Sequence, residues 1–134
     1  MGVILDSTIL IDVLNGDEAA TAKIRELEAK NDGLFTTQIN VFEIIQGVYC
    51  YGKGVDEELA AFHLLLEKIK ILDLNYLSAY YSGKLAGELK KRGITIPQGD
   101  LLIAGIGISN NLNRVVTKNE KDFSKIPGIK VETY

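Results

Sequence analysis

The stretch "VILDSTILID" (residues 3–12) places an apolar run directly before an acid, Asp6, and then continues with two hydroxyl residues and more apolar ones. The apolar run is typical of a short buried strand. Ser7 or Thr8 can cap a helix that runs through Leu14. A carboxylate at the end of a strand built for burial needs an explanation, and Asp6 is therefore a candidate functional residue.

Composition limits what the protein can be. The 134 residues, 46% of them hydrophobic, suit one compact domain over residues 1–134. No stretch approaches the roughly 20 apolar residues of a membrane span, and the start of the chain lacks the features of a signal peptide, so we expect a cytoplasmic protein with no membrane contact. A single cysteine, Cys50, and a single histidine, His63, argue against a disulfide, a zinc site or histidine-based catalysis. We expect Cys50 to be a small buried residue.

The formal net charge of −3 argues against a protein that coats nucleic acid by bulk charge. It does not exclude an enzyme that holds a short nucleic-acid segment in a local site. The net charge therefore does not decide whether the protein acts on nucleic acid.

Predicted strands and helices alternate along the chain. The predicted strands are 2–5, 34–37, 71–75, 114–117 and 129–134, with an extended segment at 94–98. The predicted helices are 7–14, 17–30, 38–51, 59–70, 76–92 and 99–111, with a short one within 119–126. This alternation predicts an α/β fold in which helices flank a central parallel sheet. In such folds, sites form outside the carboxyl ends of the strands.

Oxygen-bearing side chains from four separated segments are expected at that edge: Asp6, Glu43, Asp100, and then Asn119 and Asp122. Each has an ordinary explanation, because an acid at a helix start can simply cap the helix. Their convergence favours a functional explanation, since clustered carboxylates repel one another and resist burial unless a cation neutralises them. Ligands that are all oxygens favour magnesium or manganese.

Glu43 interrupts a strongly apolar predicted helix, and it shares a narrow strip with Asn40, Gly47 and Cys50. It could be a surface glutamate. Apolar faces on both sides of the strip leave little room for a solvated face, which favours a site residue.

The same helix carries a second apolar face, formed by Ile39, Phe42 and Tyr49. Two explanations stand side by side. The face is either buried under the helix predicted at 59–70, or it contacts a partner protein.

Four segments together resemble one known family: "ILDSTILID" (4–12), "TTQINVFEIIQG" (36–47), "IPQGDLLIAGIGI" (96–108) and "VVTKNEKDFSKIPGIKVE" (115–132). They resemble the PIN domain, and in particular the VapC-type toxins of prokaryotic toxin–antitoxin pairs, in order and spacing over essentially the whole chain. The resemblance implies a small α/β domain that acts as a magnesium-dependent endoribonuclease. It also implies a homodimer that a cognate antitoxin inhibits.

The resemblance assigns roles residue by residue. Asp6, Glu43 and Asp100 match the family's first three acids, Thr8 matches a hydroxyl near the first, and Thr117 matches a threonine after the penultimate strand. The chain departs from the family at the fourth acidic position.

At that position stands Asn119, where many relatives have aspartate, although Asp122 follows closely. An amide can still bind a metal or a metal-held water, but it removes one negative charge, which puts a second metal ion in doubt. We expect Asn119 rather than Asp122 to face the metal, because it lies closer to the end of the strand predicted at 114–117.

These residues suit phosphodiester hydrolysis. Asp6 and Asp100 would bind magnesium or manganese directly or through water, and Glu43 would orient or deprotonate the attacking water or hold a second ion. A catalytically weak PIN-like module that binds RNA or protein is the main alternative. A phosphoryl-receiver domain fits less well, because it needs an acid pair after the first strand and a central phosphorylated aspartate after a third, and the chain does not show these acids at that spacing. Which RNA is cleaved does not follow from the sequence.

Overall fold

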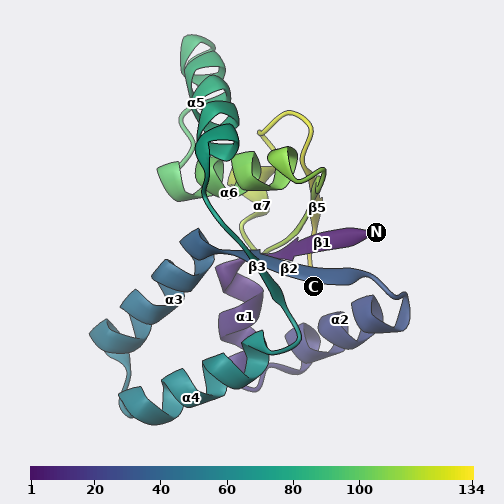
Figure 1. Cartoon of the computed structure of the whole chain (residues 1–134), viewed down its shortest axis with the longest axis vertical. Coiled ribbons are helices and arrows are strands. Elements are labelled where there is room, and N and C mark those ends of the chain that lie inside the picture. Colours follow the sequence, from purple (N-terminus) through teal and green to yellow (C-terminus); the bar gives the residue numbers. More distant parts are fainter.

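A computed structural model describes the whole chain, residues 1–134 (Figure 1). The strands are β1 Gly2–Leu5, β2 Gly33–Thr37, β3 Lys70–Leu72, β4 Arg114–Val116 and β5 Lys130–Glu132. The helices are α1 Ser7–Leu14, α2 Glu18–Ala29, α3 Gln38–Tyr51, α4 Val55–Leu66, α5 Tyr76–Lys91, α6 Gln98–Ser109 and α7 Glu120–Phe123. All neighbouring strands are parallel, in the order β3-β2-β1-β4-β5, so the predicted fold class is confirmed.

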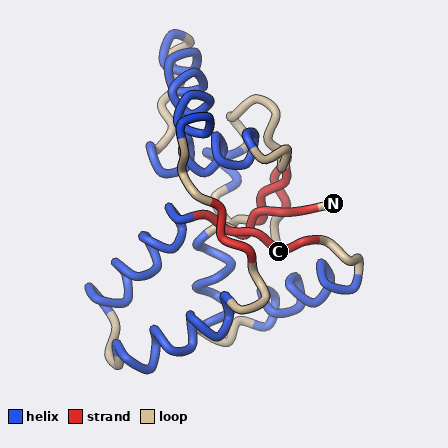
Figure 2. The backbone as a smooth tube through the Cα atoms, in the orientation of Figure 1, coloured by secondary structure: helices blue, strands red, loops and turns tan.

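Helices cover both faces of this sheet. Val3 and Leu5 point to one face and Ile4 to the other, and all three are fully buried, because successive side chains of a strand alternate. Helices α1, α2 and α4 lie on one side of the sheet, and α5, α6 and α7 on the other (Figures 1 and 2). Two apolar cores therefore cover the two faces of the sheet.

The packing of α6 against α5 is unusually close. A β-carbon added at Gly105 would lie 1.9 Å from the Ser82 hydroxyl, so only glycine permits this approach. Most of α6 is buried, which suits its apolar sequence. Helix α6, which carries Asp100 in its first turn, is thus packed closely against α5.

The strand order reverses at β1. The chain runs from β1 to β2 and β3 on one side, and β4 then pairs with the other side of β1, with Leu5 in register with Val116. The backbone N–H of Asp6 donates to the carbonyl of Val116 at 3.0 Å. Asp6 therefore sits at the topological switch point, where ligands bind in open parallel sheets.

Several predicted boundaries shift. The helix predicted at 59–70 begins at Val55 and ends at Leu66, because Lys70 already pairs with Phe35 in the sheet. The strand predicted at 71–75 ends at Leu72, since Asn75 instead caps α5 by accepting from the backbone N–H of Ser78. None of the helices combines the length and the apolar character that crossing a membrane requires.

Cys50 is exposed, so the prediction that it is buried is wrong. The buried stripe of α3 runs through Ile44 and Val48. Cys50 follows Val48 by two residues, and residues two apart on a helix do not share a face.

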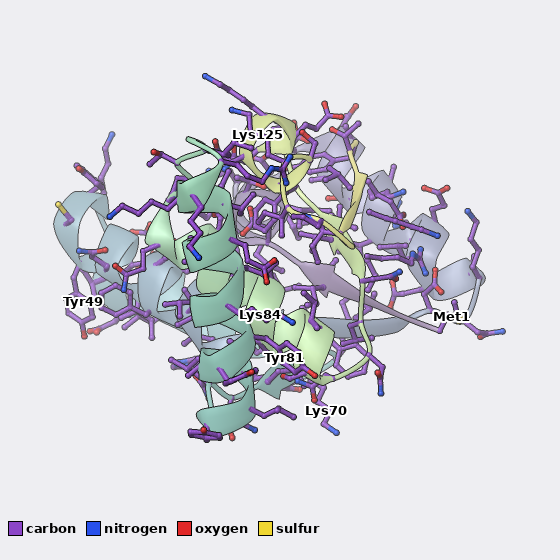
Figure 3. The ribbon with its side chains drawn as sticks, turned by 90° about the horizontal axis from the view of Figure 1, so that it is seen from above. Met1, Tyr49, Lys70, Tyr81, Lys84 and Lys125 are labelled. Carbon is purple, nitrogen blue, oxygen red and sulfur yellow. The ribbon has the colours of Figure 1, made fainter.

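The second apolar face of α3 is not covered by α4. Phe42 is 63% exposed and Tyr49 is 66% exposed, whereas Ile39 is half-buried against the core that contains α6. Tyr49 projects from the outer end of the molecule (Figure 3). Burial under the neighbouring helix is therefore the wrong explanation for Phe42 and Tyr49.

Candidate active site

Asp6 is the buried centre of the candidate site. Its side chain is held from two sides: Thr117 Oγ1 donates to Oδ2 at 2.7 Å, and Asn40 Nδ2 donates to Oδ1 at 3.0 Å. Burial raises the pKa of Asp6, and these hydrogen bonds offset part of that rise. The carboxylate is thus fixed in orientation by neutral donors rather than by a cation.

Glu43 faces the site from α3. Ser7 Oγ donates to its Oε1 at 2.6 Å, and the same hydroxyl accepts from Asn40 Nδ2 at 3.0 Å. Gly99, at the start of α6, leaves room for this carboxylate, because an added β-carbon would lie 3.1 Å from Glu43 Oε2. Glu43 is half-buried between α1 and α6 and is not an ordinary surface glutamate.

Asp100 lies in the first turn of α6 and is only 8% exposed. Asn119 Nδ2 donates to its Oδ2 at 2.8 Å. Burial, followed by the negative charges of Asp6, Asp122 and Glu43, raises the pKa of Asp100 to about 7. The acids predicted from the sequence therefore act on one another through space.

Two threonines connect the start of α1 to the loop after β4. Thr8 and Thr117 share a hydrogen bond of 3.3 Å, Thr8 Oγ1 accepts from the backbone N–H of Lys118 at 3.1 Å, and Thr117 Oγ1 accepts from that of Asn119 at 2.9 Å. These bonds place the Asn119 loop beside Asp6.

The structure thus brings all but one of the predicted residues into one hydrogen-bonded neighbourhood: Asp6, Glu43, Asp100, Asn119, Thr8 and Thr117. Asp122, on α7, is close enough for its charge to raise the pKa of Asp100, but no hydrogen bond joins its side chain to the others. Of these two residues, Asn119 is the one that contacts Asp100 through a hydrogen bond.

Two members of this network, Ser7 and Asn40, were not predicted as site residues. The sequence offered a signal for each: Ser7 directly follows Asp6, and Asn40 lies one turn before Glu43 on the same strip of α3. An asparagine that is fully buried in an apolar helix marks a position that needs specific partners.

The negative charges of the site residues are not neutralised by basic side chains of the protein. No lysine or arginine forms an ion pair with Asp6, Glu43 or Asp100. Every charge that shifts the pKa of Asp100 is negative. No group of three or more carboxylate, histidine or cysteine side chains lies close enough together to hold a metal ion by itself.

Such a fold and site define a class: a parallel α/β domain with carboxylates gathered at its switch point. The chain belongs to the PIN domain family, because the sequence profile of the PIN domain matches residues 3–129. The resemblance predicted from the sequence is thereby confirmed.

Individual relatives agree with this assignment. The chain is 30% identical to ribonuclease VapC2 of Rickettsia felis, over 97% of this chain and 96% of the relative. It is 30% identical to the tRNA(fMet)-specific endonuclease VapC of Salmonella typhimurium, over 73% of each chain. The fold is similar to a chain in the crystal structure of VapBC2 from Rickettsia felis bound to a promoter DNA fragment, with a TM-score of 0.89, 28% identity, and coverage of 100% and 99% of the two chains.

Proposed function

We propose that this protein is a metal-dependent endoribonuclease that hydrolyses RNA phosphodiester bonds and serves as the toxin of a type II toxin–antitoxin pair. One observation supports the proposal most: three acids, one directly after β1, one on α3 and one on α6, gather at the switch point of the sheet without a basic partner, in a chain whose relatives are named ribonucleases. Burying carboxylates together is unfavourable unless a cation joins them.

Magnesium or manganese suits this donor set. Asp6 and Asp100 offer hard oxygen ligands, and magnesium usually keeps several waters while one or two carboxylates bind it. Asn119 fits the same arrangement, because an amide beside Asp100 adds a polar contact without a charge. When bound, the ion stabilises charge at the phosphate and makes water a better nucleophile.

The proposed tasks of the protein's own residues follow from their contacts. Asp6 and Asp100 would hold the ion, directly or through water. Ser7 holds Oε1 of Glu43, which leaves Oε2 to accept a proton from the attacking water. Thr117 orients Asp6, and Asn119 orients Asp100.

Two surfaces suit the expected protein partners. A groove of about 400 Å³ lies between α1, α3 and α4, with Ile11, Ile44 and Tyr51 among its lining residues, and we assign it to an apolar segment of the cognate antitoxin. The exposed face around Phe42 and Tyr49 is assigned to a second copy of the chain, as in the expected homodimer. The relation to VapBC complexes supports an antitoxin partner.

The test is cleavage of a structured RNA by the purified chain with magnesium, with manganese and with a chelator. The specific alternative is a binding module without catalysis, which the amide at Asn119 favours because it removes one acid of the family pattern. RNA binding without any metal-dependent cleavage would support that module and contradict the nuclease.

A further inference from the structure

Asn40 is fully buried, and every polar atom of its side chain has a partner. Its Nδ2 donates to Asp6 Oδ1 and to Ser7 Oγ, both at 3.0 Å. Its Oδ1 accepts from the backbone N–H of Thr37 at 3.2 Å and from the Thr37 hydroxyl at 2.7 Å. The amide therefore has an acceptor end directed at the start of α3 and a donor end directed at the acids.

The acceptor end has an ordinary structural role. Thr37 and Asn40 form a capping box, in which each side chain satisfies the other residue's backbone N–H at the helix start. The donor end is not needed for that purpose. Helix α5 has an equivalent box made by Asn75 and Ser78, with a serine hydroxyl in the place of the amide.

The donor end connects two acids that come from different elements. Asn40 binds Asp6 directly, and it binds Ser7, which in turn donates to Glu43 at 2.6 Å. One buried amide thus sets the orientation of a carboxylate after β1 and of another on α3. Because its side chain is fully buried, the amide is not accessible to solvent.

We propose that Asn40 is a positioning residue of the nuclease, which holds Asp6 and, through Ser7, Glu43 in the arrangement that cleavage requires. This role rests on the proposed ribonuclease activity. Partners that orient the residues of a metal site typically contribute 10- to 100-fold to activity or to metal affinity.

The sharpest test is Asn40→Ser, because serine reproduces the capping box of α5 and removes only the amide that reaches the acids. We expect kcat for RNA cleavage to fall by about 10- to 100-fold, with KM for RNA unchanged because Asn40 does not contact substrate. Ser78→Ala is the matched control. It removes a capping-box hydroxyl of α5, away from the acids, and should lower the melting temperature without changing kcat at a temperature where the protein is folded.

Asn40→Asp provides a second variant if serine leaves the core poorly packed. It keeps an acceptor for Thr37 and replaces the donor with an oxygen facing Asp6, so kcat should fall here too. A double-mutant cycle with Ser7→Ala should show less than multiplicative losses, since Asn40 acts on Glu43 through Ser7. Combination with Ser78→Ala should be multiplicative.

Two failures are distinguishable. If the parent chain cleaves RNA and folded Asn40→Ser or Asn40→Asp retains its kcat, the positioning role is overturned and the nuclease stands. If the parent chain does not cleave RNA with either metal, the proposed function fails, and this role fails with it.

Discussion

The side-chain amide of Asn119 donates a 2.8 Å hydrogen bond to Oδ2 of Asp100. An aspartate at the same position would place another negative charge beside the Asp100 carboxylate. Burial and the charges of Asp6, Asp122 and Glu43 already raise the pKa of that carboxylate. The chain therefore has a hydrogen bond where the resemblance to the PIN family leads one to expect a charge. Asparagine in place of aspartate at position 119 should lower the repulsion between carboxylates in the metal-free protein. It should also lower the affinity of the site for a cation.

Asn119→Asp should lower the magnesium concentration needed for half-maximal RNA cleavage, because the new carboxylate adds charge beside Asp100. The same change should lower the melting temperature in the presence of a chelator, since it replaces an attractive contact with repulsion. Titration of cleavage rate against magnesium, together with thermal unfolding, measures both effects.

Asp122→Asn is the matched control for that titration. Asp122 acts on Asp100 only through its charge and has no hydrogen bond with the other site residues, so we expect its loss to raise the half-maximal magnesium concentration by less than Asn119→Asp lowers it. The opposite pattern, with strong damage in Asp122→Asn and no effect in Asn119→Asp, would place Asp122 in the fourth acidic position instead.

The pKa of Asp100, raised to about 7, predicts a pH-dependent stability of the metal-free protein. Between about pH 4 and pH 7 the folded state holds a proton that the unfolded state has released, so stability falls as the pH rises through this range. Asp100→Asn removes this effect. Its melting temperature with a chelator should exceed that of the parent by about 3 °C or more at pH 8, and the gain should shrink at pH 5.

Glu88→Gln removes an exposed acid on α5 and should show no such pH-dependent gain. If Asp100→Asn were equally stable with the parent at both pH values, Asp100 would not be under electrostatic strain in the folded protein.

The sequence predicts those site residues that belong to a local pattern, and it does not predict contacts between distant parts of the chain. Asp6 could be predicted because an acid directly after an apolar strand is a local pattern, and the alternation of strands and helices places strand ends at one edge. The role of Asn40 could not be predicted, because its donors reach Asp6 and Ser7 across more than thirty residues of chain, in a register that only the folded sheet sets. Local pattern was also a poor guide for Cys50, since composition does not show which side of α3 faces outward.

Tyr134 packs against the loop after β4. Its hydroxyl donates to Asp12 Oδ2 at 2.6 Å, Lys118 Nζ lies 2.9 Å from the same oxygen, and Lys118 also lies 5.2 Å from the centre of the Tyr134 ring. Burial and the hydrogen bond with Asp12 raise the pKa of Tyr134. Tyr134→Phe should lower the free energy of unfolding by about 1 kcal/mol through loss of this bond.

Urea unfolding measures that change, with Tyr49→Phe as the control, because the Tyr49 side chain is largely exposed. Equal stability of the two variants would show that the bond between Tyr134 and Asp12 contributes nothing to the fold.

The exposed face of α3 predicts self-association. Light scattering of the parent chain should give the mass of a dimer, and Phe42→Ser combined with Tyr49→Ser should shift it towards the monomer by removing apolar contact area. Tyr76→Ser, which changes an aromatic that is 83% exposed on α5, is the control and should leave the dimer intact. A dimer that persists in the double variant would assign this face to another partner.

The central claim is that the acids at the switch point form a metal-dependent RNA-cleaving site. The most direct measurement compares RNA cleavage by the parent chain and by Asp6→Asn with magnesium, with manganese and with a chelator. We predict cleavage that requires the metal and that falls by more than about 100-fold in folded Asp6→Asn, since a ligand should matter more than the residues that orient it. Cleavage that persists in the chelator, or full activity in Asp6→Asn, would contradict the account.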